Sequence, residues 1–443
     1  MIMIDNIKLA NYKSFFADQV KEAIDEQQKI NRSQMRNLFK TGELSLAYVD
    51  SIQHETGMII LKCPRRMAPR LKVLKGVCII KKGAKQALGE HVTEWICRWD
   101  EFVDNKDFHS SGSDMTPMYY VHTGDSNYDY VACSGFSFKL YDILSKALVD
   151  GKSLSLIVHN PFPPVEYFRN LASYMDAFSS NDELNLEPTI DYEEWTPEEL
   201  AFDEQKPTGI SDTIIDTLAN EHCCIVQGPP GTGKSYTIAS VISSYLDAGK
   251  TVCVTTMANK GLIELIKQKP LQKYVKEGRV SKTNLSIDER KQVSGVKAAS
   301  ADLQVPGGEM LCATNYQLSS VFSEKKMTLY GLPQYDLVVI EEASQAFLTA
   351  IVAFKQLGID CLIVGDPMQL PPIVKLNNPQ YNSWNVATQV EGLKSMVLGT
   401  SIKSYRIVTT FRLTSRSASL TKYFYGNRFV SVKQDYLDFT KAN

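Results

Sequence analysis

The sequence contains no long apolar run, which excludes the simplest kinds of membrane protein. No stretch approaches the roughly 20 consecutive apolar residues that a membrane-spanning helix needs. The N-terminal stretch MIMIDNIKLANYKSFF has no sustained apolar segment after a basic start, so it does not form a convincing signal peptide. We therefore expect a cytoplasmic protein with no membrane partner.

Disulfide and metal-binding patterns are also absent. The chain has nine cysteines, an odd number, and no two of them form a CxxC pair. Its six histidines are scattered without the spacing of metal ligands. Several cysteines lie within apolar runs, where a thiol packs as a small hydrophobic group. These features predict a reducing compartment, with neither a disulfide framework nor a zinc site.

Charge of one sign is not in excess either. The formal net charge is −2, so no overall positive field attracts the chain to nucleic acid, and such binding would need local basic patches. One candidate is the segment between Lys62 and Lys85, which is rich in lysine and arginine and has no acidic residue. Both a solvated face and a phosphate-contacting surface fit this pattern.

The residue pattern changes several times along the 443-residue chain, which is long enough for two or three domains. Residues 8–40 have apolar residues at helical spacing, and short β-rich runs separated by turn residues occupy 44–158. A second helical segment covers 163–178. The acidic, proline-punctuated stretch that follows is interpreted as a linker, with a domain boundary near 205.

After residue 205, short apolar strands alternate with helical patterns. The strands are apolar at nearly every position, as expected for parallel strands that are buried on both faces. This pattern predicts a doubly wound α/β domain. The predicted strands are Cys223–Gln227, Thr251–Thr255, Met310–Thr314, Leu337–Ile340 and Cys361–Val364.

The strongest motif is the glycine-rich sequence GPPGTGKS at 228–235. It follows a predicted strand and opens a predicted helix, which is the context that a phosphate-binding Walker A loop requires. Glycine lets the backbone wrap closely around phosphates, and the loop N–H groups and the helix dipole favour an anion. Lys234 is expected to reach the β- and γ-phosphates, and Ser235 to bind Mg²⁺. The predicted nucleotide-binding residues are Gly228, Pro229, Pro230, Gly231, Thr232, Gly233, Lys234, Ser235 and Tyr236.

Two further apolar strands end in polar groups. In LVVIEEASQ (337–345), Glu341 is expected to hold Mg²⁺ and Glu342 to orient or deprotonate the attacking water. Aspartate is more usual at the first position, and Mg²⁺ demands tight octahedral geometry. Nucleotide binding should therefore be retained, while the effect on hydrolysis stays open. In CLIVGDPMQLPP (361–372), Gln369 reaches the same edge of the sheet, where its amide can contact the γ-phosphate.

Taken in order, GPPGTGKS, EEASQA and GDPMQLPP resemble the motifs of superfamily 1 helicases of the 1B group. This group is typified by the nonsense-mediated-decay helicase and the Okazaki-fragment nuclease-helicase. The segments TTMANK and CATN resemble motifs Ia and Ic, and the resemblance implies nucleic-acid contacts by Asn259 and Thr314. The segment TFRL (410–413) resembles motif IV and implies that Arg412 acts like an arginine finger, although the family usually has tyrosine where this chain has Phe411.

The resemblance covers about 205–430 by motif and implies a RecA-like P-loop NTPase sheet, with an N-terminal β-barrel on a helical stalk. It implies ATP and Mg²⁺ as cofactors and single-stranded DNA or RNA as a partner. The later helicase motifs are missing from the sequence, so a further chain or C-terminal segment is expected to complete the second RecA-like domain. The predicted domains are a stalk (1–43), a β-barrel (44–160), a returning stalk helix with the acidic linker (161–204), a first RecA-like domain (205–400) and the truncated start of a second (401–443).

The sequence leaves open the function of the chain, its selectivity for adenine and the structure of one lysine-rich segment. The leading hypothesis is an ATP-dependent helicase or translocase, and the alternative is an ATP-switched nucleic-acid-binding or regulatory module. An AAA-type remodelling ATPase fits the motif order less well. The family's adenine-binding glutamine is absent from 208–216, which puts selectivity for adenine in question. The lysine-rich segment 267–297 fits a solvated loop better than an insertion near the nucleic-acid channel.

Overall fold

The computed structural model forms two compact units, Met1–Val20 with Glu166–Asn443 and Lys21–Val165. Within the residues that it describes, no helix combines the length and the apolar character needed to cross a bilayer. The described residues are 2–34, 36–37, 45–56, 58–64, 73–74, 77–80, 116–121, 127–133, 145, 155–158, 165–187, 195–229, 231–285, 287–299, 302–323, 326, 332–374, 383–426 and 428–433.

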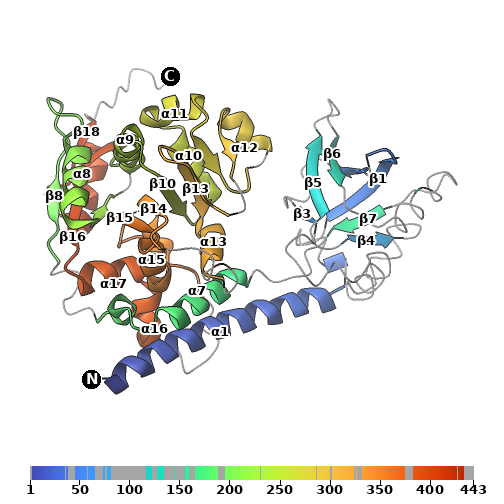
Figure 1. Ribbon diagram of the computed structural model, residues 1–443, viewed down its shortest axis with the longest axis horizontal. Coiled ribbons are helices and arrows are strands. Elements are labelled where there is room, and N and C mark those ends of the chain that lie inside the picture. The colour runs from blue at the N-terminus through green and yellow to red at the C-terminus, as the bar shows by residue number, and fades with distance from the viewer. Residues whose placement is uncertain are drawn as a thin grey trace. The chain divides into compact units, whose positions relative to one another are not determined.

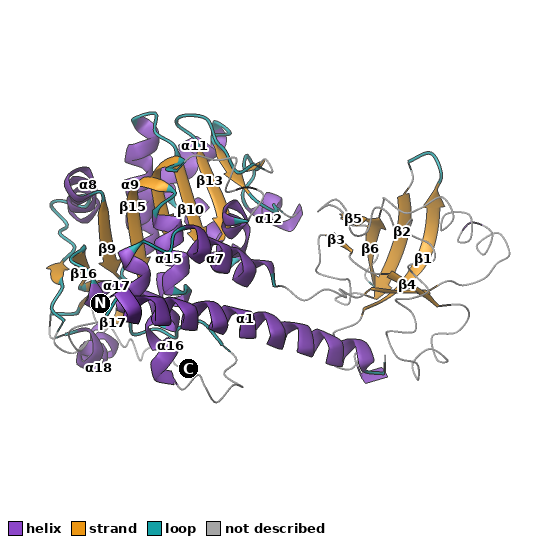
Figure 2. Cartoon of the chain, turned by 60° about the horizontal axis from the view of Figure 1, so that its bottom comes forward, coloured by secondary structure: helices purple, strands orange, loops and turns teal. Residues whose placement is uncertain are grey.

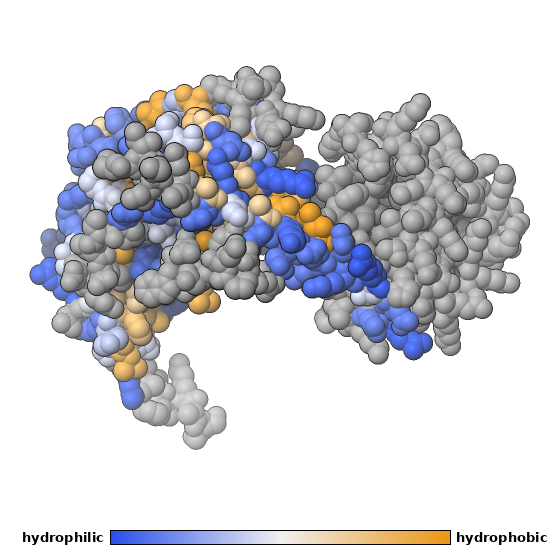
Figure 3. Space-filling view, turned by 90° about the horizontal axis from the view of Figure 1, so that it is seen from below, coloured by the Kyte–Doolittle hydropathy of each residue, from blue (hydrophilic) through white to orange (hydrophobic). Residues whose placement is uncertain are grey.

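The predicted stalk helices are present as α1 (Ile2–Arg32) and α7 (Glu166–Ala177). Figures 1 and 2 both show α7 beside the first half of α1, and an ion pair of 2.5 Å joins Lys13 to Asp176. Aromatic residues contribute to this packing, because the ring centroid of the buried Phe16 lies 6.1 Å from that of Phe168 on α7 and 5.4 Å from that of Phe347 in the α/β domain. Seen from below, the described surface is largely hydrophilic, with smaller hydrophobic patches (Figure 3).

The second unit contains an antiparallel sheet in the order β3-β5-β6-β2-β1-β7-β4. This agrees with the predicted all-β character of 44–160, while closure of the sheet into a barrel stays a prediction. The basic residues between Arg65 and Lys85 lie outside the described residues. The strands are β1 (Ser45–Gln53), β2 (Met58–Pro64), β3 (Val73–Leu74), β4 (Val77–Ile80), β5 (Thr116–Val121), β6 (Tyr128–Cys133) and β7 (Ser155–Val158).

The predicted α/β domain is confirmed as a nine-stranded sheet in the order β12-β11-β13-β10-β14-β15-β9-β16-β8, with parallel pairing throughout. The five predicted strands all occur in it, within a few residues of their expected ends. The strands are β8 (Glu198–Leu200), β9 (Cys223–Gln227), β10 (Val252–Thr256), β11 (Val280–Lys282), β12 (Lys297–Ala298), β13 (Met310–Thr314), β14 (Tyr335–Ile340), β15 (Gly358–Gly365) and β16 (Lys403–Ile407).

Helices cover both faces of this sheet (Figure 2). Helices α8 to α11 pack into one hydrophobic core, and α1, α7, α15 and α17 pack into the other. Successive residues of β9 alternate between the two cores, as the period of a strand requires. The remaining helices are α8 (Gly209–Glu221), α9 (Lys234–Asp247), α10 (Asn259–Ile266), α11 (Gln272–Lys276), α12 (Ile287–Gln292), α13 (Asn315–Leu318), α15 (Leu348–Lys355), α16 (Ser383–Val390), α17 (Gly392–Gly399) and α18 (Ser415–Tyr425). Short 3₁₀ helices are η1 (Asp182–Asn185), η3 (Lys269–Leu271), η4 (Ser319–Phe322) and η5 (Ala343–Gln345).

Two segments that were predicted to be irregular contribute described residues to the core and sheet of the α/β domain. The acidic stretch after α7 is not a plain linker, because Leu184 and Trp195 are buried in the core and β8 extends the sheet. The lysine-rich segment 267–297 is not a solvated loop, since it contains α11 and two strands of the sheet. In both cases scattered apolar residues between the charges pack against the domain.

The predicted boundary at 401 is also wrong. Strand β16 pairs in parallel with β9, the strand that leads into the glycine-rich loop, so the sheet continues to Ile407. A separate parallel pair follows, formed by β17 (Thr409–Thr414) and β18 (Val430–Lys433), with α18 as the crossover between them. The alternating polar residues of β16 hid this strand in the sequence, because only Tyr405 and Ile407 are buried.

Candidate functional site

The glycine-rich loop connects β9 to α9, and two of its glycines adopt backbone conformations that other residues rarely adopt. Gly231 and Gly233 have φ values of +78° and +77°. A Cβ atom on Gly231 would lie 2.3 Å from Cβ of Arg412, so a larger residue would collide there. Pro230 lies outside the described residues. The glycines therefore keep the loop backbone accessible to a ligand, as a phosphate cradle requires.

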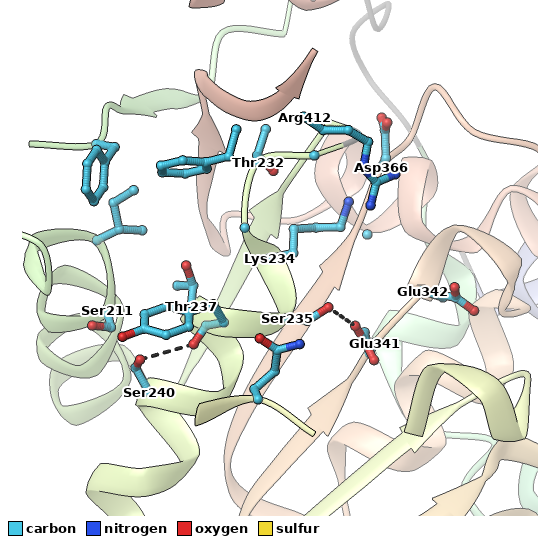
Figure 4. A pocket seen from close by; sticks show the side chains of 18 of the residues that line it. Ser211, Thr232, Lys234, Ser235, Thr237, Ser240, Glu341, Glu342, Asp366 and Arg412 are labelled. Atoms are coloured by element: carbon cyan, nitrogen blue, oxygen red, sulfur yellow. Dashed lines mark hydrogen bonds between the residues drawn. The ribbon is translucent and has the colours of Figure 1, made fainter. Parts of the chain in front are cut away.

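The loop lines a cavity with a volume of about 870 Å³, part of which is drawn in Figure 4. The cavity brings together residues from the three sequence motifs and from motif IV. Gly228 and Pro229 are buried at the base of the loop and do not line it. The predicted residues that line the cavity are Gly231, Thr232, Gly233, Lys234, Ser235, Tyr236, Glu341, Glu342, Gln369 and Arg412.

Lys234 is the first residue of α9, and its ammonium group turns back toward the loop. It donates to the carbonyl oxygen of Gly228 and, at 3.5 Å, to that of Pro229. Burial lowers the pKa of Lys234, while the nearby carboxylates, with Asp366 foremost, oppose this effect. An anion placed in the cradle would compensate the cost of burying this charge.

Ser235 and Glu341 form the part of the cavity that suits a divalent cation. Ser235 Oγ donates to Glu341 Oε1 at 3.3 Å, whereas the buried Oε2 has no hydrogen-bond partner among the described residues. Burial and repulsion from Glu342 raise the pKa of Glu341 to about 7. The described residues contain no cluster of three or more histidine, cysteine or acidic side chains that could hold a metal alone. The hydroxyl of Ser235 and the carboxylate of Glu341 are oxygen groups that fit Mg²⁺, which keeps several waters and takes phosphate oxygens as further ligands.

Glu342 lines the cavity but has a different orientation from Glu341. Its backbone is left-handed, with φ 53° and ψ 38°, which costs a non-glycine residue roughly 1–2 kcal/mol. Its Oε2 accepts a hydrogen bond of 3.3 Å from Oγ1 of Thr256. Figure 4 shows the Glu342 carboxylate directed away from Lys234 and Ser235. Strained backbone of this kind is concentrated at functional sites.

The third motif supplies a buried carboxylate as well as the predicted glutamine. Asp366 is 1% exposed and lies on the cavity wall, while Gln369 is exposed and donates to Asp366 Oδ2 at 3.4 Å. Asp366 also accepts from Tyr425 at 2.8 Å and from Gln227 at 3.5 Å. No role was predicted from the sequence for Asp366 or Tyr425. The position of Asp366 at the end of an apolar strand was a signal that could have identified it. Nothing in the sequence links Tyr425 to Asp366.

Arg412 reaches the cavity because β17 runs directly against the glycine-rich loop. The backbone N–H of Phe411 donates to the carbonyl oxygen of Gly231 at 2.8 Å. Figure 4 shows Arg412 beside Lys234 and Asp366. The predicted arginine therefore lies in the same cavity as the phosphate-binding lysine.

Comparison with known proteins agrees with this arrangement. A family model described as an AAA domain matches residues 211–375. The chain is 31% identical over 209 residues to the DNA replication ATP-dependent helicase/nuclease dna2 of Schizosaccharomyces pombe, and 26% identical over 207 residues to that of Saccharomyces cerevisiae. These matches cover 45% and 44% of this chain, but only 14% and 12% of the relatives. Together with the order of the motifs, these matches agree with the predicted resemblance to superfamily 1 helicases.

Solved helicase structures superpose only loosely on this chain. The Pif1 helicase from Candida albicans has a TM-score of 0.26 and 15% identity, over 45% of this chain and 39% of that one. The arterivirus nonstructural protein 10 helicase with DNA has a TM-score of 0.28 and 15% identity, over 49% and 44% of the two chains. At these scores the superpositions carry no argument about the site.

Several residues that line the cavity were not predicted from the sequence. Phe202 packs edge-on against Phe411, with ring centroids 5.0 Å apart. Ser211 and Gln268 also line the cavity. Aromatic and polar groups of this kind suit a nucleobase. No sequence signal identified Phe202, because its place depends on the contact with β17.

The predicted nucleic-acid contacts lie outside this cavity, at the carboxyl ends of neighbouring strands. Asn259 is exposed at the start of α10, and its Oδ1 accepts from Nζ of the fully buried Lys282 at 2.7 Å. Thr314 is 7% exposed and accepts from the backbone N–H of Gln317 as the N-cap of α13. Asn259 is thus open to a ligand, while the hydroxyl of Thr314 already has a capping role. Their contact roles stay predictions.

Proposed function

We propose that this chain binds ATP with Mg²⁺ and couples hydrolysis to movement along single-stranded DNA or RNA. The observation that carries the proposal is the convergence of Lys234, Glu341 and Arg412, from three distant motifs, in one cavity beside a glycine cradle. Such groups stabilise the charge that develops during phosphoryl transfer. The names of the relatives, which are ATP-dependent helicase/nucleases, support the same function.

Each predicted residue of the cavity has a separate proposed role in ATP hydrolysis. Lys234 and the loop N–H groups bind the phosphates, and Ser235 with Glu341 would hold Mg²⁺, which neutralises phosphate charge when bound. Glu342 orients or deprotonates the attacking water once its carboxylate turns toward Lys234. Gln369 and Arg412 act at the γ-phosphate.

The binding site for the single-stranded nucleic acid is proposed to lie at the carboxyl edge of the sheet. Asn259 and Thr314 stand at the ends of β10 and β13, which pair directly in the sheet. Contacts to phosphates carry no sequence information, so binding should be largely insensitive to sequence and should weaken with salt. Either DNA or RNA fits such contacts.

The segment after β16 supports the proposal that further polypeptide completes a second RecA-like domain. The pair β17–β18 is parallel, and parallel strands are normally covered on both faces. On α18, Leu420 is 75% exposed, Tyr423 90% and Phe424 54%. An apolar face of this kind fits coverage by a later segment or a partner chain. The 443-residue chain alone should therefore bind ATP and single strands but unwind duplexes poorly.

A cytoplasmic location stays a prediction.

The second candidate function is an ATP-switched nucleic-acid-binding module. The orientation of Glu342 favours this candidate, because a carboxylate turned away from Lys234 and Ser235 suits slow hydrolysis. A single-turnover ATPase assay with and without an oligonucleotide separates the two functions. Hydrolysis that is stimulated by the strand and lost in Glu342→Gln supports the motor, whereas binding without stimulated hydrolysis supports the switch.

A further inference from the structure

The two adjacent carboxylates at the end of β14 have different partners. Glu341 accepts from Ser235 of the phosphate-binding loop region, whereas Glu342 accepts from Thr256, the last residue of β10. Thr256 is fully buried, so its hydroxyl is shielded from water and is fixed in place by its surroundings. Figure 4 shows that Glu341 points to Ser235 and that Glu342 points elsewhere.

The backbone of Glu342 helps to fix this orientation. Its left-handed conformation, with φ 53° and ψ 38°, sets the direction in which the side chain leaves the strand. Such a conformation persists in a non-glycine residue only when the surrounding structure holds it. To act on a water beside the γ-phosphate, the Glu342 carboxylate has to leave Thr256 and turn toward Lys234.

The same threonine contacts the helix that carries the proposed strand contact. Helix α10 begins at Asn259, three residues after Thr256. Gly261, in the first turn of α10, lies close to Thr256. A Cβ atom added to Gly261 would be 3.2 Å from Thr256 Oγ1 and 3.8 Å from Glu341 Oε2. Little free space separates the start of α10 from the hydroxyl, so a movement of this turn displaces Thr256.

We propose that Thr256 is a positioning residue that holds Glu342 away from the reacting phosphate until a nucleic-acid strand binds at the start of α10. The inference rests on the proposed function and extends it to regulation. A single strand that contacts Asn259 shifts the first turn of α10, breaks the Thr256–Glu342 hydrogen bond and frees the carboxylate. ATP hydrolysis then depends on the presence of the strand.

The test is Thr256→Val, which removes the hydroxyl and keeps the branched shape of the side chain. ATP hydrolysis by the full chain is measured with and without oligothymidylate, and again with oligouridylate. Without a strand, the hydrolysis rate of the variant should rise about tenfold, the effect of losing one hydrogen bond to a charged group. At saturating strand its rate should equal that of the wild type. A simple loss of packing cannot raise the rate.

Thr349→Val is the matched control, because Thr349 is also fully buried and donates to Gln389 at 3.0 Å on a helix outside the cavity. Its two rates should not change. An unchanged strand-free rate in Thr256→Val overturns the inference, and so does an equal fall of both rates. Either result, with stimulated hydrolysis in the wild type, leaves the proposed function intact. If neither protein hydrolyses ATP under any condition, the proposed function is wrong and the inference falls with it.

Discussion

Tyr425, the last residue of α18, donates a hydrogen bond of 2.8 Å to Asp366, which directly follows strand β15. Both side chains are buried, with exposed fractions of 8% and 1%. The acceptor also holds the amide of Gln369, so one carboxylate contacts both the predicted γ-phosphate sensor and the helix of the following β-α-β segment. This contact ties the nucleotide cavity to the β17–α18–β18 segment.

Removing only the hydroxyl, as in Tyr425→Phe, should therefore affect both stability and catalysis. The buried carboxylate loses one of its donors, which should lower the free energy of unfolding by about 1–3 kcal/mol. The kcat for ATP should fall more than the ATP affinity, since Gln369 loses its fixed support. Urea denaturation and steady-state kinetics measure the two effects. Tyr423→Phe is the control, because Tyr423 is 90% exposed; equal effects in both variants would contradict the prediction.

The phosphate-binding role of Lys234 predicts a loss of nucleotide affinity in Lys234→Ala. Charge-assisted hydrogen bonds contribute about 1.5–3 kcal/mol each, so ATP affinity should fall about 10-fold to 100-fold. Isothermal titration calorimetry with MgATP measures the change. Lys250→Ala, at an exposed position just beyond the other end of α9, should bind as the wild type does. Unchanged affinity in Lys234→Ala would remove the basis of the proposed function.

The raised pKa of Glu341, about 7 against an ordinary 4.5, predicts a pH-dependent stability in the absence of metal. Between these two values the folded state binds more protons than the unfolded state, so stability falls as pH rises through this window. From pH 5.5 to 7.5 this group should lower the free energy of unfolding by about 2 kcal/mol. Urea denaturation in EDTA, compared with Glu341→Gln, isolates the effect, because the variant lacks the titrating carboxyl. Identical pH profiles for the two proteins would show that Glu341 is not perturbed.

Magnesium binding should show the opposite pH dependence. Mg²⁺ binds the ionised carboxylate and competes with the proton. The Mg²⁺ concentration needed for half-maximal MgATP binding should therefore rise up to about tenfold for each pH unit below 7. Titration at pH 6 and 7.5 in the wild type and in Glu341→Gln checks this, and a wild-type midpoint that does not change with pH would contradict it.

The sequence predicted those parts of the fold and site that depend on local patterns. The five motif-bearing strands were visible because each is apolar along its length, and the loop was visible because Gly231 and Gly233 need left-handed backbone. Strands β8, β11 and β16 were missed because their charged residues interrupt the apolar pattern. Contacts such as Tyr425 with Asp366 were missed for a different reason: they join side chains far apart in sequence, and only the folded sheet brings them together.

The buried position of Lys282 was missed for both reasons: its charge hides the strand, and its partner Asn259 lies far from it in the sequence. Lys282 lies in the lysine-rich segment, yet it is fully buried, with Nζ 2.7 Å from Asn259 Oδ1 and 3.2 Å from Glu289 Oε1. Because Lys282 occupies the amide oxygen, the amide N–H₂ group of Asn259 is the part left to donate to a phosphate. In Lys282→Met, single-strand affinity should fall about tenfold as this orientation is lost, while ATP affinity is retained.

Fluorescence anisotropy with a labelled oligothymidylate measures this change, and Lys273→Met serves as the control for loss of one lysine at an exposed ion pair with Asp247. A double-mutant cycle with Asn259→Ala gives the sharper result. If Lys282 acts by orienting the amide, adding Lys282→Met to Asn259→Ala should cause little further loss of strand affinity. Additive losses would mean that Lys282 affects the strand by another route, and parallel losses of ATP and strand affinity would mean that its role is packing alone.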